Sequence, residues 1–236
     1  MSNALIERVA TSSDLGSNAY VLYEQIKDKK NSVFVDLGVR NGYSSAILSI
    51  NSKNHNNKIY GIDVTFDDFI SDIVEKDNYL QIEGDSSSVG KYSEIEELNQ
   101  IDFLFVDTLH VREQVLCELY YWVPKLKNGA TIAFHDSHWP EGKKENIGGK
   151  IWERVDSAIV DFFGLSELVD YSDKNIKVSC YPDSWGMTFV TISDVKKFKN
   201  KIKDWNDVFE KRNELISVYW NSNTVQDKVI DLELTP

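Results

Sequence analysis

Five aspartates stand at or near the ends of short apolar runs of the kind that form buried strands. They are Asp36, Asp63, Asp85, Asp107 and Asp136. In an open parallel sheet, ligands bind outside the carboxyl ends of the strands, so these carboxylates are expected to converge on one crevice. A helix cap or a turn would explain one or two of them, but it explains all five less well.

Three of the four histidines lie in the same two loops as the last two of these aspartates. His110 follows Asp107 by three residues, while His135 and His138 flank Asp136. An imidazole is the usual general base for removing a hydroxyl proton near neutral pH. We therefore take His110 as the first candidate for a base acting beside Asp107, and His138 as the second. A structural role for His110 remains an equal alternative.

Two glycines mark the point where an apolar strand meets a helix in the stretch SVFVDLGVRNGYSSAIL, residues 32–48. Gly38 and Gly42 have G-x-x-x-G spacing, which is not the dinucleotide fingerprint and disfavours an NAD-linked oxidoreductase. Gly38 lets the backbone pass close beneath a ligand, and Gly42 lets the helix begin without a Cβ in the way. Asp63 comes 25 residues after Gly38, a suitable place to bind two ribose hydroxyls, and GDSS (84–87) follows.

The elements that must position these residues alternate between strand and helix. Apolar, β-branched runs predict strands over residues 32–38, 58–64, 79–85, 101–107, 130–136, 167–172 and 186–192. Helical spacing over 111–126 places five residues on one face, namely Val111, Val115, Leu119, Trp122 and Leu126. The alternation predicts an α/β protein with a Rossmann-like, doubly wound, mostly parallel seven-stranded sheet that has helices on both faces.

Three segments fall outside that core pattern. Residues 194–220 are expected to form an extra C-terminal helix. We therefore divide the chain into a domain over 1–193, which includes N-terminal helices, and a C-terminal helix and tail over 194–236. The helix would pack on the domain or form a homo-oligomer interface. Residues 137–150 are expected to be a lid over an acceptor site, with Trp139 as a stacking wall or a packing residue, and 180–186 to be the opposite rim.

Composition narrows the class of partner. The 236 residues carry a formal charge of −12, and such an acidic surface disfavours nucleic acid as a partner. No apolar run approaches the length of a membrane span, and no secretory leader opens the sequence. Two cysteines do not make a disulfide framework. We therefore expect a cytoplasmic protein that acts on a small molecule, without a membrane or a nucleic acid as partner.

Taken in order, these stretches resemble the motifs of class I S-adenosylmethionine-dependent methyltransferases. VFVDLGVRNGYSS is similar to motif I, YGIDV to motif II and IEGDSS to motif III. Residues 101–138 are similar to the cephalosporin-hydroxylase-like and macrocin-type (methyltransferase 24-like) group of small-molecule O-methyltransferases. The resemblance covers residues 15–192. It implies transfer of a methyl group to a hydroxyl of a small polar molecule, such as a sugar or a natural product.

The resemblance also implies how S-adenosylmethionine would be bound. Motif I contains Asp36, Gly38, Gly42 and Ser44, of which Gly38 and Ser44 would lie along the methionine part of the cofactor. Asp63 would bind the ribose hydroxyls. Two further residues would border the adenine, namely Asp85 and Ser86.

A divalent metal is implied as well, with Asp107, His135 and Asp136 as its ligands. Such a cation would lower the pKa of a substrate hydroxyl and fix it against the methyl group. His135 stands where many relatives have an acid, and imidazole suits Mn²⁺, Fe²⁺, Zn²⁺ or Ni²⁺ better than Mg²⁺. Mg²⁺ and Mn²⁺ are the main candidates, and the alternative is that the two aspartates only shape a polar pocket.

Two other readings of the function remain open at this point. One is an N-methyltransferase or a related metal-assisted enzyme on the same scaffold. The other is a non-catalytic cofactor-binding protein that kept the fold. Asp63, Asp107 and His110 argue against the second, because a degenerate site need not keep them together.

Overall fold

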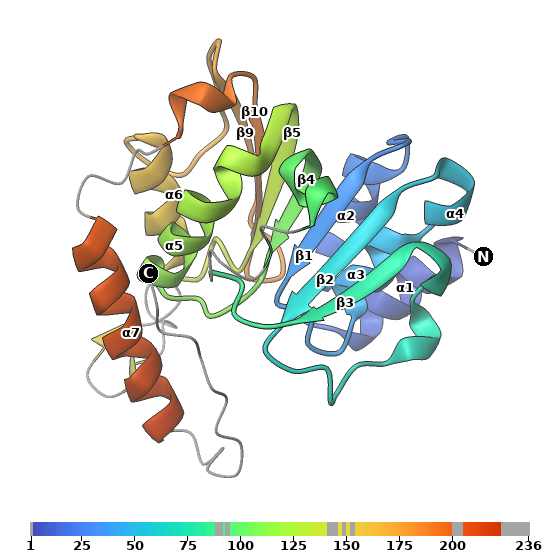
Figure 1. The fold of residues 1–236 in the computed structure, drawn as a ribbon, viewed down its shortest axis with the longest axis horizontal. Coiled ribbons are helices and arrows are strands. Elements are labelled where there is room, and N and C mark those ends of the chain that lie inside the picture. The colour runs from blue at the N-terminus through green and yellow to red at the C-terminus, as the bar shows by residue number, and fades with distance from the viewer. Residues whose placement is uncertain are drawn as a thin grey trace.

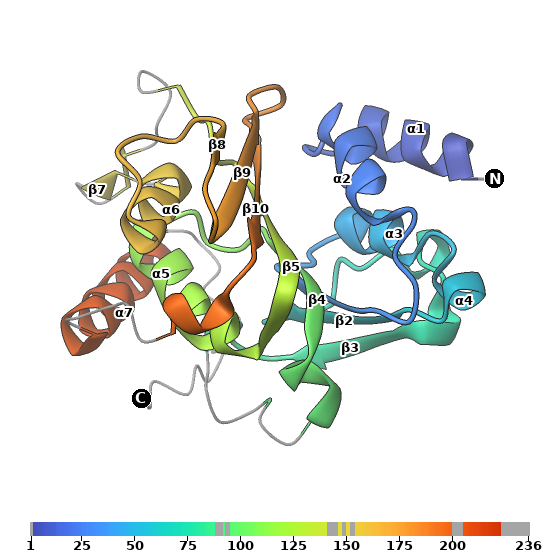
Figure 2. The ribbon, with the colours of Figure 1, turned by 90° about the horizontal axis from the view of Figure 1, so that it is seen from above.

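A twisted sheet with helices on both faces forms the body of the protein (Figures 1 and 2). The computed structural model describes residues 2–87, 92, 95–140, 146–147, 150–151, 154–199 and 205–222. Within them the main sheet has eight strands in the order β3-β2-β1-β4-β5-β10-β9-β8. The strands are β1 (Val33–Leu37), β2 (Lys58–Asp63), β3 (Tyr79–Glu83), β4 (Ile101–Val106), β5 (Leu126–His135), β8 (Tyr171–Ser172), β9 (Ile176–Tyr181) and β10 (Met187–Ile192).

The first five strands of that order are parallel, and the remaining three pair in antiparallel fashion. The α/β class and the mostly parallel, doubly wound sheet are therefore confirmed. The strand count differs, because the sequence reading missed β9 and placed a strand over 167–172, where only Tyr171–Ser172 pairs. In β9, buried Ile176 and Val178 alternate with exposed Lys177, a half-buried pattern unlike the apolar runs of the central strands. A separate hairpin joins β6 (Asn146–Ile147) and β7 (Lys150–Ile151).

The helices divide between the two faces of the sheet (Figure 2). On one side lie α1 (Ser2–Ser12), α2 (Asn18–Ile26) and α3 (Tyr43–Ser49), with the short α4 (Ser52–His55) nearby. On the other side lie α5 (Arg112–Trp122) and α6 (Val155–Phe163), and α7 (Trp205–Ser222) packs on α5. Single 3₁₀ turns cover Ser71–Ile73, Lys76–Asn78, Glu96–Asn99, Val123–Lys125 and Val195–Lys197.

Alternation along the central strands builds two separate cores. In β4, Phe103 and Phe105 point toward the α1–α3 side, while Leu104 and Val106 point toward α5 and α6. All four side chains are buried, as expected for strands covered on both faces. The helix predicted over residues 111–126 is shorter in the structure, since α5 ends at Trp122 and Leu126 already belongs to β5; all five of the predicted side chains are nevertheless buried. The sheet is thus held rigidly from both sides, and its carboxyl edge can position a site.

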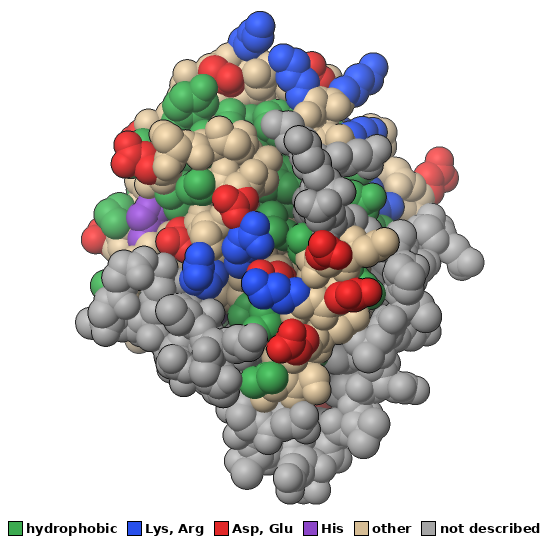
Figure 3. Space-filling model, turned by 90° about the vertical axis from the view of Figure 1, so that its left-hand side faces the viewer, with side chains coloured by type: hydrophobic (Ala, Val, Ile, Leu, Met, Phe, Trp, Pro, Cys, Tyr) green, Lys and Arg blue, Asp and Glu red, His purple; other side chains and the backbone are tan. Residues whose placement is uncertain are grey.

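The C-terminal helix begins later than expected. The sequence predicts a helix over 194–220, but the structure has a 3₁₀ turn at Val195–Lys197 and then α7 from Trp205, with 200–204 outside the described residues. The Asp194 side chain accepts a hydrogen bond from the Lys196 amide at 3.2 Å, which favours a short turn over a continuous helix. Acidic and basic side chains lie together in the middle of the face that includes α7 (Figure 3). Among the described residues, no helix combines the length and apolar character that a membrane crossing requires.

Candidate functional site

A cavity of about 290 Å³ opens at the carboxyl ends of β1, β2, β3 and β4. This volume is near the lower end of the range for small-molecule pockets. The cavity is bordered by four of the predicted cofactor residues and by the predicted metal ligand Asp107. Its lining is Gly38, Arg40, Ile62, Asp63, Val64, Gly84, Asp85, Ser86, Asp107, Thr108, Leu109, Gln114, Arg212 and Ile216.

Gly38 joins the loop after β1 to the loop after β4. Its φ is +84°, and a Cβ added there would lie 2.0 Å from the Asp107 carbonyl oxygen. The Asp107 amide donates to the Leu37 carbonyl at 2.9 Å, which fixes the two loops side by side. Glycine is therefore required at position 38 both for its backbone conformation and for the close approach.

Asp63 ends β2 and presents its carboxylate to the cavity. One oxygen accepts the Arg40 amide at 2.7 Å, and the other accepts the Thr65 amide at 3.4 Å. A carboxylate has about four acceptor sites, so two remain for donors from a ligand. The geometry suits binding of a ribose diol.

The other three residues of motif I do not border the cavity as the structure describes it. The Asp36 carboxylate accepts the Ser44 hydroxyl at 2.9 Å and the Ser45 hydroxyl at 2.5 Å, which ties β1 to α3 inside the protein. Burial raises the pKa of Asp36 to about 7. Gly42 has a φ of +88°, and a Cβ there would lie 2.6 Å from the Phe69 ring. These residues therefore stabilise the turn between β1 and α3 and do not line the cavity.

Two carboxylates and two imidazoles gather where β4 and β5 end. His110 Nε2 lies 3.3 Å from Asp107 Oδ1 and 3.0 Å from Asp136 Oδ2. His135 Nδ1 lies 3.4 Å and 3.3 Å from the same two oxygens. Among the described residues, Asp107, His110 and Asp136 each offer one atom within 4.8 Å of the others, close enough to share a metal ion. His135 faces the same oxygens from a fully buried position.

The chemistry of this cluster fits a divalent cation. Within the described part of the chain, Asp136 Oδ1 and both ring nitrogens of His135 are buried without a hydrogen-bond partner. His135 Nδ1 is close to the carboxylates, but not in hydrogen-bond geometry. Oxygen and imidazole ligands together suit Mn²⁺, Fe²⁺ or Zn²⁺ more than Mg²⁺.

Electrostatics in the cluster favour positive charge. Burial lowers the pKa of His110, but the bonds to Asp107 and Asp136 outweigh it and raise that pKa to about 10. Burial opposes protonation of His135 as well, yet the Asp107 and Asp136 charges hold its pKa well above the usual value. Burial raises the pKa of Asp136, while the neighbouring imidazoles of His110 and His135 more than offset this and leave it lowered. The carboxylates therefore attract a cation, whether a proton or a metal ion.

The second base candidate, His138, lies where two predicted loops meet. Its amide donates to the Trp185 carbonyl at 2.8 Å, and a Cβ on Gly186 would lie 2.4 Å from the His138 Cβ. Burial lowers the His138 pKa. Trp139 stacks on Trp185, with ring centroids 4.2 Å apart. The start of segment 137–150 thus contacts segment 180–186, while the rest of the expected lid, at 141–145 and 148–149, lies outside the described residues.

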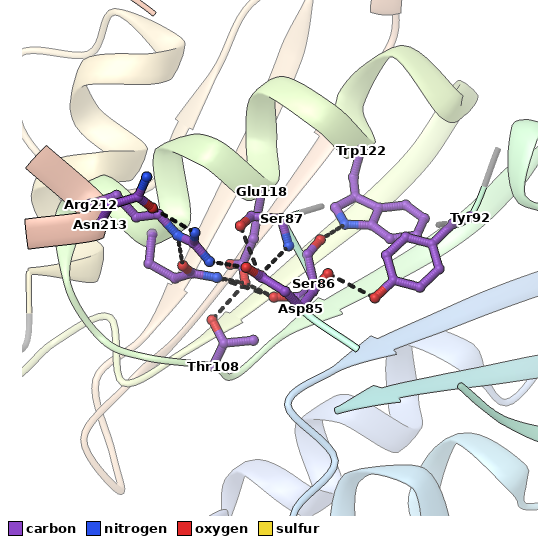
Figure 4. A network of polar contacts seen from close by, with 10 residues as sticks. Asp85, Ser86, Ser87, Tyr92, Thr108, Glu118, Trp122, Arg212 and Asn213 are labelled. Carbon is purple, nitrogen blue, oxygen red and sulfur yellow. Dashed lines mark hydrogen bonds and ion pairs between the residues drawn. The ribbon is translucent and has the colours of Figure 1, made fainter. Parts of the chain in front are cut away.

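The sequence reading missed a polar network on the other side of the cavity (Figure 4). Arg212 of α7 pairs with Asp85, and Gln114 and Glu118 of α5 bond Ser86. Burial raises the pKa of Glu118 to about 7. Gln114 and Glu118 are polar residues at i, i+4 spacing on a buried face of α5. This spacing could have indicated a buried polar network from the sequence. Arg212 had no such signal, because its partners are distant in the sequence.

Comparisons with known proteins bear on the domain family and the fold. Residues 35–137 match the family model of a methyltransferase domain, Methyltransf_24. The solved structure of CalS11, a TDP-rhamnose 3'-O-methyltransferase of calicheamicin biosynthesis, is similar at a TM-score of 0.52 and 16% identity, covering 82% of this chain and 94% of that one. The S-adenosylhomocysteine-bound methyltransferase PaMTH1 of Podospora anserina is similar at 0.53 and 14%, covering 82% and 88%.

No curated protein sequence is similar enough to count as a relative. The two structural likenesses are too distant in sequence to show more than the fold. The family match, however, spans the strand ends that carry Gly38, Asp63, Asp85, Asp107 and Asp136. The chain therefore carries a methyltransferase domain at residues 35–137, and its fold is that of solved methyltransferases.

Proposed function

We propose that this methyltransferase transfers its methyl group to a hydroxyl of a small polar molecule, with the help of a divalent cation. The observation that carries the proposal is the cluster of Asp107, His110 and Asp136, which adjoins the cavity through Asp107. An amine acceptor needs little help to lose a proton, whereas a hydroxyl must be acidified. A cation bound by the cluster would lower the pKa of the acceptor hydroxyl.

The chain's residues can be assigned by their place along the cavity. Asp63 would bind the ribose hydroxyls of S-adenosylmethionine. Asp85 and Ser86 would border its adenine. Gly38 and Asp107 border the end nearest the cluster, where the reacting atoms would meet. S-adenosylmethionine supplies the methyl group as an electrophile, so the protein's task is to align donor and acceptor and to hold water away.

The proposal gives His110 a different role from the one first predicted from the sequence. The sequence made it the first candidate for a general base, with a structural role as an equal alternative. His110 Nε2 lies between the Asp107 and Asp136 carboxylates. A cation bound there would take up the Nε2 lone pair, so His110 could not also accept the hydroxyl proton at that atom. We assign it as a third ligand with Asp107 and Asp136. His135 faces the same two carboxylates from a buried position, and its unpartnered ring nitrogens keep it a candidate for a further ligand, as the resemblance implies.

The first structural relative supports a sugar as one acceptor class, since CalS11 is named for O-methylation of a nucleotide-linked sugar. We propose hydroxylated sugars and glycosylated natural products as acceptors to be tried first. Whether the cation is Mg²⁺ or Mn²⁺ is decided by adding each to the chelated enzyme.

The test is a transfer assay with isotope-labelled S-adenosylmethionine and matched panels of hydroxyl and amine acceptors. Label should appear on hydroxyl acceptors, disappear in chelator, and return with Mn²⁺ or Mg²⁺. Asp107→Asn should abolish the return, whereas Asp161→Asn, an exposed carboxylate on α6, should leave it intact. Transfer to amines alone, or a full rate in chelator, would contradict the proposal.

A further inference from the structure

One wall of the cofactor cavity comes from a helix beyond the matched methyltransferase domain. Arg212 and Ile216 of α7 line the cavity together with Asp85 and Ser86, although the family match ends at residue 137. Arg212 is only 1% exposed, which is unusual for an arginine. A buried guanidinium at a ligand cavity calls for a specific account.

Each nitrogen of the Arg212 guanidinium has a partner. Nη2 pairs with Asp85 Oδ2, Nε donates to Gln114 Oε1 at 2.7 Å, and Nη1 donates to Asn213 Oδ1 at 3.0 Å. Gln114 is itself fixed, since its amide donates to Glu118 at 2.8 Å. The planar fork of Arg212 therefore has one orientation, and it imposes that orientation on Asp85 (Figure 4).

The bonds to Asp85 leave room for one more donor. Oδ1 accepts the Ser87 amide at 2.9 Å and the Ser87 hydroxyl at 2.8 Å, while Oδ2 accepts from Arg212. A carboxylate has about four acceptor sites, so the described residues use three and one remains. Asp85 borders the cavity, where a ligand can reach that last site.

The order of residues along the cavity places the base of the cofactor there. The reacting end lies at Gly38 and Asp107, beside the metal cluster, and Asp63 follows at the next strand end. A nucleoside with its ribose on Asp63 extends its base farther in the same direction, to Asp85 after β3. Adenine carries an exocyclic amine, which is a donor of the kind that the free acceptor site requires.

We propose that Arg212 is a positioning residue that holds the Asp85 carboxylate toward the exocyclic amine of adenine. Through this contact, α7 would determine the preference of the cavity for adenine over a base without that amine. The inference rests on the proposed cofactor site and adds to it a helix outside the matched domain.

The test is calorimetric titration with S-adenosylhomocysteine and with its hypoxanthine counterpart, which has a carbonyl oxygen in place of the amine. Wild-type protein should prefer the adenine compound by about 10- to 100-fold, the worth of a hydrogen bond to a charged group. Arg212→Gln should reduce the preference to about 3-fold or less, and Arg212→Lys should restore part of it. Lys211→Gln removes a neighbouring charge that pairs with Glu113 at 2.9 Å, and it should keep the wild-type preference.

The preference ratio separates positioning from simple bracing of the fold. An Arg212→Gln protein that melts earlier but keeps the wild-type ratio would overturn the inference. If that variant does not fold, Arg212→Lys and Asp85→Asn decide, because either one with an unchanged ratio is equally contrary. If the wild-type protein bound S-adenosylhomocysteine and its hypoxanthine counterpart equally well, this inference alone would be overturned. No binding of either compound would overturn the proposed cofactor site as well.

Discussion

Substituting alanine for Gly38 should damage both the fold and the cofactor site. An L residue at a φ of +84° is strained by about 1–2 kcal/mol. The new Cβ would lie 2.0 Å from the Asp107 carbonyl oxygen, so the loops after β1 and β4 must separate by about 1 Å to relieve the contact. Overpacking of this kind costs about 1–3 kcal/mol. The free energy of unfolding should therefore fall by about 2–5 kcal/mol.

Gly129→Ala is the matched control. Gly129 has almost the same φ, +85°, but among the described residues no heavy atom lies within 4 Å of a Cβ placed there. It should lose only the backbone strain, about 1–2 kcal/mol. Urea denaturation of the two variants gives the difference, and titration with S-adenosylhomocysteine should show weaker binding for Gly38→Ala alone. Equal losses of stability with equal affinities would refute the claim that these two loops are fixed against each other.

Three further outcomes follow from individual side chains. Asp136→Asn should weaken Mn²⁺ binding by at least about 10-fold, since even a change in a residue behind the metal ligands causes a loss of that size. Electron paramagnetic resonance of Mn²⁺ measures the affinity, and Asp161→Asn is the control. Equal Mn²⁺ affinities of the two variants would remove Asp136 from the ligands. Burial raises the folded-state pKa of Glu118 from 4.5 to about 7, so its stabilising contribution is complete below pH 4.5 and is lost as pH rises through 7. Between pH 5 and 7 the wild type should therefore lose up to about 1.4 kcal/mol per pH unit more than Glu118→Gln, and parallel stability curves would contradict the shift. Asn18→Ala removes the amide that donates to the carbonyls of Asp183 and Ser184 at 2.8 and 3.2 Å. The free energy of unfolding, measured by urea denaturation, should fall by about 1–3 kcal/mol. An unchanged midpoint would show that α2 does not anchor segment 180–186.

The central sheet could be read from the sequence because its strands are short, apolar and followed by acids. Burial on both faces makes each strand a continuous apolar run, and the parallel order follows from the helices between the runs. Strands near the antiparallel edge of the sheet were harder to predict from the sequence. β9 alternates buried Ile176 and Val178 with exposed Lys177, so its hydrophobic signal is half as dense.

The candidate site was predictable where it depends on strand ends and less so elsewhere. Asp63, Asp85 and Asp107 reach the cavity because they lie at or just beyond the ends of their strands, whereas Asp36 lies within β1 and turns inward to α3. Strand position alone does not tell on which side an acid emerges. Arg212 could not be predicted at all, since its contact with Asp85 spans 127 positions and depends on how α7 packs.

A structure of the protein crystallised with S-adenosylhomocysteine tests the central claim most directly. The ligand should occupy the cavity at the carboxyl ends of β1 to β4, with its ribose hydroxyls on the Asp63 carboxylate. Its sulfur should lie at the Gly38 and Asp107 end and its adenine beside Asp85. Ligand bound elsewhere on the protein, or bound in this cavity with the ribose away from Asp63, would contradict the account.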